Sequence, residues 1–241
     1  MTTLQTVREI ALEQPASIRV FEKFGIDYCC NGRKPLAEAC SAANIEISAV
    51  LEALERSAVI PIHAGTDWTQ ASLERLVRHI VHTHHAYVLA ELPRLGELAQ
   101  KVVNRHGDTQ PHLPALQRRV ALLTAELTSH LAKEETILFP YIIELERAQN
   151  GNTAAPKACF SSVDGPIATM MAEHDDAGAL LAEIKDLSNS YTPPVGACPT
   201  YVGYYTALKE FEQDLHQHIH LENNILFPRA AELERNSVRA V

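Results

Sequence analysis

The chain has 241 residues, and its 30 acidic and 21 basic side chains give a formal net charge of −9 at pH 7. No block of lysine or arginine is present to neutralise phosphates, so we expect no nucleic-acid partner. No stretch approaches the roughly 20 apolar residues that cross a bilayer, and the first residues lack the pattern of a secretory signal. Five cysteines, two of them adjacent, do not form a secreted disulfide framework. These features predict a cytoplasmic protein.

The first part of the chain, residues 1–60, predicts a small domain of short helices. Thr6 and Glu9 have the spacing of a capping box at the start of the first helix, and Pro15 ends it. Gly25 is placed as the stop of the second helix. A core of this size is marginal alone. Residues 59–67 then read as a linker.

From residue 68 onward the pattern changes to long amphipathic helices. The first contains Pro93, which should bend or end it, and the third begins at Asp164, which is placed as its cap. The other two span about residues 114–146 and 200–234. With no competing strand signal, the sequence predicts an all-α protein, in which residues 61–241 form an up-and-down four-helix bundle.

An internal repeat places the same polar motif in both halves of this bundle. Each copy has a histidine, a glutamate four residues later, and then Ile-Leu-Phe-Pro: His130 with Glu134, and His218 with Glu222. A further histidine, His85 or His174, precedes each copy by 45 or 44 residues. Two helical hairpins folded together would therefore bring four imidazoles and two carboxylates to mid-bundle.

This constellation predicts a dinuclear metal site. A single such motif would be better explained as a polar stripe facing solvent, but both copies lie beside leucines and isoleucines at helical spacing. Burying carboxylates and imidazoles without partners costs on the order of several kcal/mol each, which two divalent cations would compensate. Imidazole and carboxylate donors without thiolate leave iron, manganese or zinc. Iron is favoured, because carboxylate-bridged di-iron centres are commonly held by helical bundles.

Together the motifs resemble the Repair of Iron Centres family, whose bundle is hemerythrin-like. The segment Glu173–Gly178 contributes to the likeness, and Asp27–Gly32 is similar to the signature of that family's small ScdA-type N-terminal domain. The resemblance implies a cytoplasmic di-iron protein of the nitrosative and oxidative stress response that repairs damaged iron-sulfur clusters. Some members of the family are described instead as binding or reducing nitric oxide.

The resemblance also implies which residues hold the metal. The six expected ligands are His85, His130, Glu134, His174, His218 and Glu222. The two glutamates would bridge two iron ions, together with an oxo or hydroxo group. The neighbouring His82 and His84 are alternative ligands on the first helix.

Further side chains are expected near the centre. Glu126, Glu173, Gly178 and Asp214 are candidates to border the site or to form an access path for a ligand. Because Gly178 has no side chain, it could leave room for a diatomic ligand beside the metal. Close helix packing explains a glycine at this position equally well. Cys29 and Cys30 precede Asn-Gly, which suggests an exposed turn where thiolates could transfer iron or exchange disulfides. Buried structural cysteines are the alternative.

The predicted function is therefore repair of iron-sulfur clusters by iron donation, by nitric oxide binding and reduction, or by both. Whether the chain is an enzyme, such as a nitric oxide reductase, is left open. The alternatives are a scavenger or sensor that binds nitric oxide or dioxygen without turnover, and a zinc-stabilised interaction module. The expected partners are damaged iron-sulfur proteins and a diatomic ligand such as nitric oxide, and the chain could pair as a homodimer.

Overall fold

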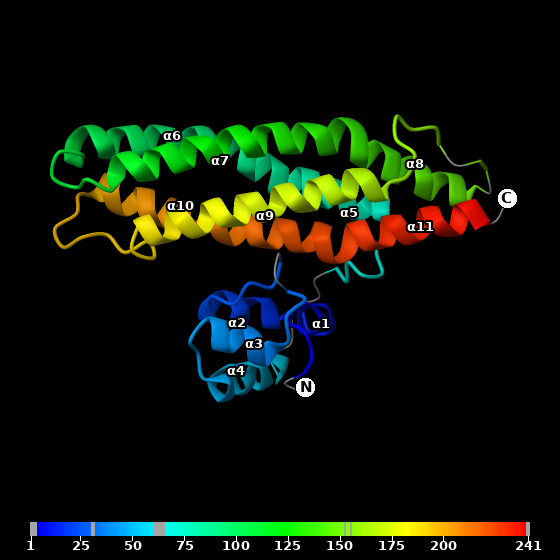
Figure 1. The fold of residues 1–241 in the computed structure, drawn as a ribbon, viewed down its shortest axis with the longest axis horizontal. Coiled ribbons are helices and arrows are strands. Elements are labelled where there is room, and N and C mark those ends of the chain that lie inside the picture. The colour runs from blue at the N-terminus through cyan, green and yellow to red at the C-terminus, as the bar shows by residue number, and fades with distance from the viewer. Residues whose placement is uncertain (1–3, 30–31, 60–65, 152, 155, 240–241) are drawn as a thin grey trace. The chain divides into compact units, whose positions relative to one another are not determined.

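A computed structural model describes residues 4–29, 32–59, 66–151, 153–154 and 156–239 (Figure 1). Over these ranges the regular structure is helical, and the one β-type contact is an isolated bridge between Thr6 and Pro35. The all-α prediction is confirmed. None of the helices described is long and apolar enough to cross a membrane.

Four short helices lie in the N-terminal part: α1 (Val7–Glu13), α2 (Ser17–Phe24), α3 (Leu36–Ala42) and α4 (Ile47–Val59). The predicted capping box is present, since the Thr6 hydroxyl accepts from the Glu9 N–H and the Glu9 carboxylate accepts from the Thr6 N–H. Gly25 ends α2 in the left-handed conformation, with φ of 65°, which glycine adopts without steric cost.

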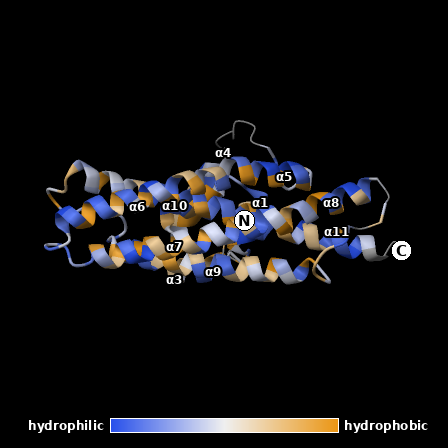
Figure 2. Ribbon diagram, turned by 90° about the horizontal axis from the view of Figure 1, so that it is seen from above, coloured by the Kyte–Doolittle hydropathy of each residue, from blue (hydrophilic) through white to orange (hydrophobic). Residues whose placement is uncertain are grey.

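The rest of the chain forms four long helical stretches, three of which contain a π-helical segment. The first is α5 (Leu73–His79), η1 (Ile80–His85) and α6 (Ala86–His106); the second is α7 (Leu113–Lys133), η2 (Glu134–Leu138) and α8 (Phe139–Asn150); the third is α9 (Asp164–Leu187); and the fourth is α10 (Pro199–Leu221), η3 (Glu222–Leu226) and α11 (Phe227–Arg239). Figure 2 shows hydrophobic and hydrophilic residues mixed along each stretch, as expected of amphipathic helices.

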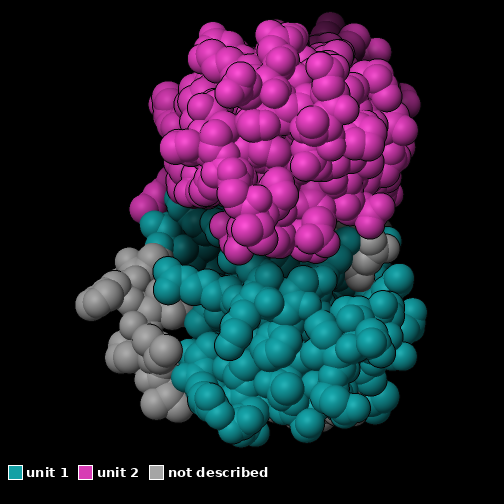
Figure 3. Space-filling model, turned by 90° about the vertical axis from the view of Figure 1, so that its left-hand side faces the viewer, with its two compact units in different colours: residues 1–72, 216–229 teal, residues 73–215, 230–241 magenta. Residues whose placement is uncertain are grey.

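The chain divides into two compact units (Figure 3). The first contains residues 1–72 and 216–229, and the second contains residues 73–215 and 230–241. Within the first unit, α2 and α3 pack on α4. Within the second, α7 packs on both α6 and α9, and α5 packs on α8. The predicted domain boundary at residue 60 and much of the predicted linker lie outside the described residues.

Proline explains two of the π-helical segments. η2 and η3 both end directly before Phe-Pro, at Pro140 and Pro228. A proline lacks an N–H, and its ring clashes with the carbonyl four residues earlier. The wider π-turn accommodates this clash. In each copy the phenylalanine N–H bonds to a carbonyl five residues back, that of Glu134 or Glu222.

The structure decides two expectations about helix ends. Pro93 was expected to bend or end its helix, and it does not end it, because α6 continues through it to His106 and buries Leu92 and Leu95 on either side of it. The expectation that Asp164 caps α9 is wrong. Val163 occupies the N-cap position, and it makes no side-chain capping hydrogen bond. The Val163 N–H instead bonds to the Glu234 carboxylate of α11, with distances of 3.1 and 3.0 Å to its two oxygens.

Glu234 also accepts hydrogen bonds from the hydroxyls of Ser162 and Tyr141, at 2.7 and 2.6 Å. Replacing Glu234 by alanine should therefore lower the free energy of unfolding by about 1–3 kcal/mol, because it leaves a helix N-terminus and two hydroxyls without their acceptor. Urea denaturation at matched metal content would measure this loss. The exposed neighbour Glu232 provides the control. An equal loss for Glu232→Ala would contradict the assignment.

Candidate metal centre

Six polar side chains are buried in the middle of the helical stretches. His85 ends η1, His130 lies on α7 and His174 lies on α9, while Glu134 and Glu222 begin η2 and η3, and His218 lies on α10. Both carboxylates are 0% exposed and the four imidazoles are at most 3% exposed. Side chains of these types are rarely buried unless they are paired or bind a metal.

These side chains form two groups whose potential ligand atoms all lie within 4.8 Å of one another. One group contains His85, Glu134, His218 and Glu222, and the other contains His130, Glu134, His174 and Glu222. The two groups together contain the six residues that the sequence resemblance points to. Glu134 and Glu222 belong to both groups, which is the arrangement that allows a carboxylate to bridge two ions.

The separations between neighbouring donor atoms suit a shared cation. His130 Nε2 lies 3.0 Å from His174 Nε2 and 3.4 Å from Glu134 Oε2, and His218 Nε2 lies 2.9 Å from Glu222 Oε1. Metal–ligand bonds of about 2.1 Å at octahedral or tetrahedral angles place adjacent donors about 3.0–3.4 Å apart. Neither oxygen of Glu134 has a hydrogen-bond partner among the described residues. A buried carboxylate of this kind fits a cation.

Two outer carboxylates orient the histidines. Glu135 Oε1 lies 2.8 Å from His85 Nδ1, and Glu173 Oε2 lies 2.8 Å from His130 Nδ1. An Nδ1–H that donates to a carboxylate leaves the Nε2 lone pair available to a metal ion. Glu173 is also paired with Lys133. Burial raises the pKa of Glu173, but the hydrogen bonds from Lys133 and His130 outweigh that effect and leave the pKa below its usual range.

The pairing of Glu135 with a buried histidine was not predicted from the sequence. Its signal was the second glutamate directly after Glu134, at the position that asparagine occupies in the other copy of the repeat.

Other candidates occupy different positions. Asp214 Oδ1 lies 3.0 Å from Nδ1 of His84, so its imidazole partner is a buried histidine that belongs to neither ligand group. His82 is exposed and also lies outside both groups. Gly178 is half-buried on α9, one turn after His174.

A cavity of about 360 Å³ has His130 among its lining residues. Its lining includes Glu126, Lys133, Glu173 and Asp176. Glu126 and Asp176 are exposed, whereas His130 is buried. The cavity therefore extends from acidic surface residues to one of the six buried side chains.

The expectation of an exposed Cys29 is wrong, and the alternative of a buried cysteine holds. Cys29 is buried rather than exposed, and its thiol donates to Asp27 Oδ1 at 3.4 Å while its backbone N–H donates to the same oxygen at 3.0 Å. Cys30 lies outside the described residues. His220 is also buried, and its ring packs against Tyr28.

Comparisons with known proteins give consistent matches. Residues 76–230 match the family model of the hemerythrin HHE cation binding domain, and residues 3–58 match ScdA_N, a domain of unknown function. The chain is 39% identical over 227 residues to the iron-sulfur cluster repair protein YtfE of Citrobacter koseri, covering 94% of this chain and 96% of that protein. It is 37% identical over 226 residues to the YtfE protein of Yersinia pseudotuberculosis, with the same coverage.

The outer carboxylates should affect metal affinity. Glu135→Ala and Glu173→Ala should each weaken ferrous iron binding by about 10- to 100-fold, because the partner imidazole loses the group that fixes its orientation. Competition with a chromophoric chelator measures the affinity. Glu126→Ala is the matched control, since Glu126 lines the same cavity but makes no hydrogen bond to an imidazole in the part of the chain described here. Unchanged affinity in both outer variants would contradict the assignment.

Proposed function

The chain belongs to the hemerythrin-like family of iron-sulfur cluster repair proteins, and on that premise we propose that it restores damaged iron-sulfur clusters by means of a di-iron centre. The observation that carries the proposal is the pair of carboxylates, Glu134 and Glu222, that belong to two groups of buried nitrogen and oxygen donors at once. We assign the six buried side chains as the ligands and these two glutamates as the bridges.

Charge and donor type support this assignment. Four neutral imidazoles and two carboxylates leave two divalent cations with a net positive charge in a buried site. An oxo or hydroxo group between the ions would reduce that charge. The bound pair would supply ferrous iron as cargo for a damaged cluster and a site for a diatomic ligand such as nitric oxide.

We assign the cavity at His130 as the route by which iron enters and leaves. Glu126, Glu173 and Asp176 line it with carboxylates, which attract cations. Lys133 neutralises one of them through its pairing with Glu173. Exposed Glu126 then acts on the rate of iron loading and release, while Glu173 acts mainly on affinity through His130.

The proposal includes a transfer or redox role for Cys29 and Cys30. A thiolate is a good ligand for ferrous iron and a good nucleophile for disulfide exchange. Cys29 is buried, so its thiol would act after a local opening that exposes it. The proposed targets are damaged iron-sulfur proteins, because the relatives are named iron-sulfur cluster repair proteins. Action in the cytoplasm and pairing as a homodimer remain predictions.

A repair assay tests the proposal. A hydratase whose [4Fe–4S] cluster has been damaged by nitric oxide is incubated anaerobically with the chain loaded with isotopically labelled ferrous iron. We expect enzyme activity to return and the label to appear in the client. His174→Ala should lose most of this effect because it removes a ligand, whereas His82→Ala, a change at an exposed histidine outside both groups, should retain it. Equal repair by metal-free protein would contradict the proposal.

Rapid mixing with nitric oxide tests the diatomic site. Nitrous oxide as product indicates reduction, and nitric oxide held without turnover or iron transfer indicates the alternative scavenger or sensor. Gly178→Leu should slow nitric oxide binding severalfold without lowering iron content, because its side chain would fill space one turn from His174. Gly203→Leu, on an exposed face of α10, is the control. Unchanged binding kinetics for Gly178→Leu would assign this glycine to helix packing.

A further inference from the structure

Residues 216–229 carry two pairs of buried polar side chains on one helical stretch. His218 and Glu222 form the first pair and are assigned above as metal ligands. His220 and Asn224 form the second pair, displaced by two positions along the chain. Two residues correspond to about 200° of rotation in an α-helix, so the two pairs lie on opposite sides of the stretch.

The second pair holds the loop that contains Cys29. The Asn224 side-chain amide donates to the backbone carbonyl of Tyr28 at 3.2 Å, and its nitrogen lies 2.8 Å from His220 Nδ1. At that distance His220 Nδ1 accepts the second amide hydrogen. The Tyr28 ring packs against the His220 ring, with 5.5 Å between centroids. Tyr28 directly precedes Cys29.

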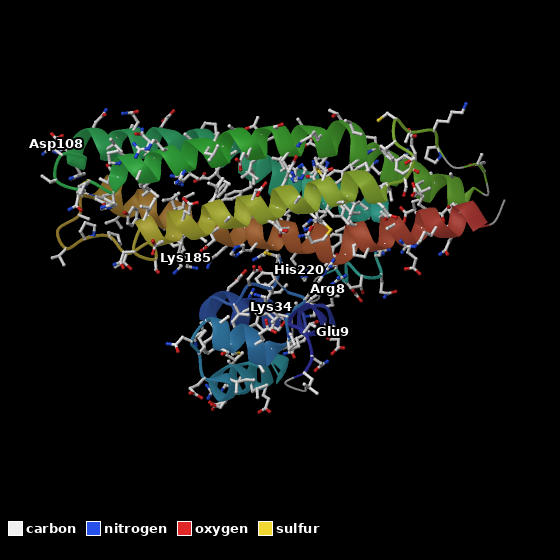
Figure 4. The ribbon with its side chains drawn as sticks, viewed as in Figure 1. Arg8, Glu9, Lys34, Asp108, Lys185 and His220 are labelled. Carbon is white, nitrogen blue, oxygen red and sulfur yellow. The ribbon has the colours of Figure 1, made fainter. Side chains whose placement is uncertain are left out.

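Arg8 completes this attachment (Figure 4). Its guanidinium donates to the backbone carbonyl of Asn224 at 3.1 Å. In an α-helix that carbonyl would accept from residue 228, but Pro228 has no N–H to donate. Arg8 is therefore a side-chain donor to a carbonyl that an α-helical N–H from residue 228 does not reach. The backbone N–H of Arg8 also donates to the Gly32 carbonyl at 2.7 Å, which ties down the far end of the cysteine loop.

The other copy of the repeat lacks this arrangement. Ala132 and Thr136 occupy the positions equivalent to His220 and Asn224, and both are exposed. Ile137 is 45% exposed, whereas its counterpart Ile225 is 6% exposed. Metal binding by itself therefore does not require a polar pair on this side of the motif, and the second copy has an additional task.

We propose that Arg8, His220 and Asn224 couple metal occupancy to the exposure of the Cys29 thiol. With ions bound to His218 and Glu222, the stretch is rigid and its opposite side holds the Tyr28 carbonyl, so Cys29 stays shielded. When the ions leave, the buried Glu222 carboxylate loses its counter-charge, the stretch loosens and the loop is released. This inference rests on the proposed metal centre.

Thiol alkylation tests the coupling. Full-length protein with Cys30→Ser is treated anaerobically with N-ethylmaleimide, with and without bound ferrous iron, and tryptic peptides are quantified by mass spectrometry. Residues 24–33 then contain Cys29 as their one cysteine. We expect Cys29 to react about tenfold faster or more in the metal-free protein. Buried Cys40 on α3 should stay protected in both states, and exposed Cys159 should react alike in both.

Variants separate the coupling from general unfolding. Asn224→Asp keeps the size of the side chain but removes both amide donors, so Cys29 should react rapidly whether iron is bound or not. Asn104→Asp makes the same change at an exposed helical position and should behave as the parent. Equal Cys29 rates with and without iron, or a parallel rise at Cys40, would overturn the inference. Failure of the protein to bind iron would show in the metal analysis and would instead overturn the proposed function.

Discussion

The burial of two carboxylates is the constraint on which the rest of this structure depends, because buried negative charges need compensation. Glu134 and Glu222 are 0% exposed in the middle of long helices, surrounded by four buried imidazoles. A helix interior contributes no compensating donor at such positions, so the negative charges require cations or protons. Glu135 and Glu173 turn two imidazole rings so that their Nε2 atoms face the same space. The outer hydrogen bonds and the buried donors thus form one arrangement suited to metal ions.

Proline gives the repeat its second structural role. Pro140 and Pro228 each follow a π-helical segment that begins at one of the two buried glutamates. The missing N–H and the clash of the proline ring are accommodated by the wider turn. In the second copy the carbonyl of Asn224, within this segment, accepts from Arg8. The segment proposed to hold metal ligands therefore also contacts the N-terminal helices of the same unit.

In the proposed function, this arrangement joins two kinds of iron chemistry in one chain. The buried imidazoles and carboxylates suit stable storage of iron, whereas a cysteine thiolate suits brief binding and transfer. In the proposed function these tasks must alternate, since an exposed thiol beside ferrous iron would be open to oxidation. Burial of Cys29 against Asp27 provides protection in the closed arrangement. In the proposed function, the cavity at His130 offers iron a separate route.

The sequence by itself determined the helical class, the capping box at Thr6, the stop at Gly25 and the repeated spacing of histidine and glutamate, because these are local patterns read within one or two helical turns. The resemblance named His85 as a ligand, with the adjacent His84 as an alternative, but the sequence did not show that Asp214 pairs with His84. Nor did it show that Cys29 and His220 are buried. Those outcomes depend on contacts between residues more than 100 positions apart, such as Asn224 with Tyr28. Spacing along one helix defines a face, but only packing decides what covers it.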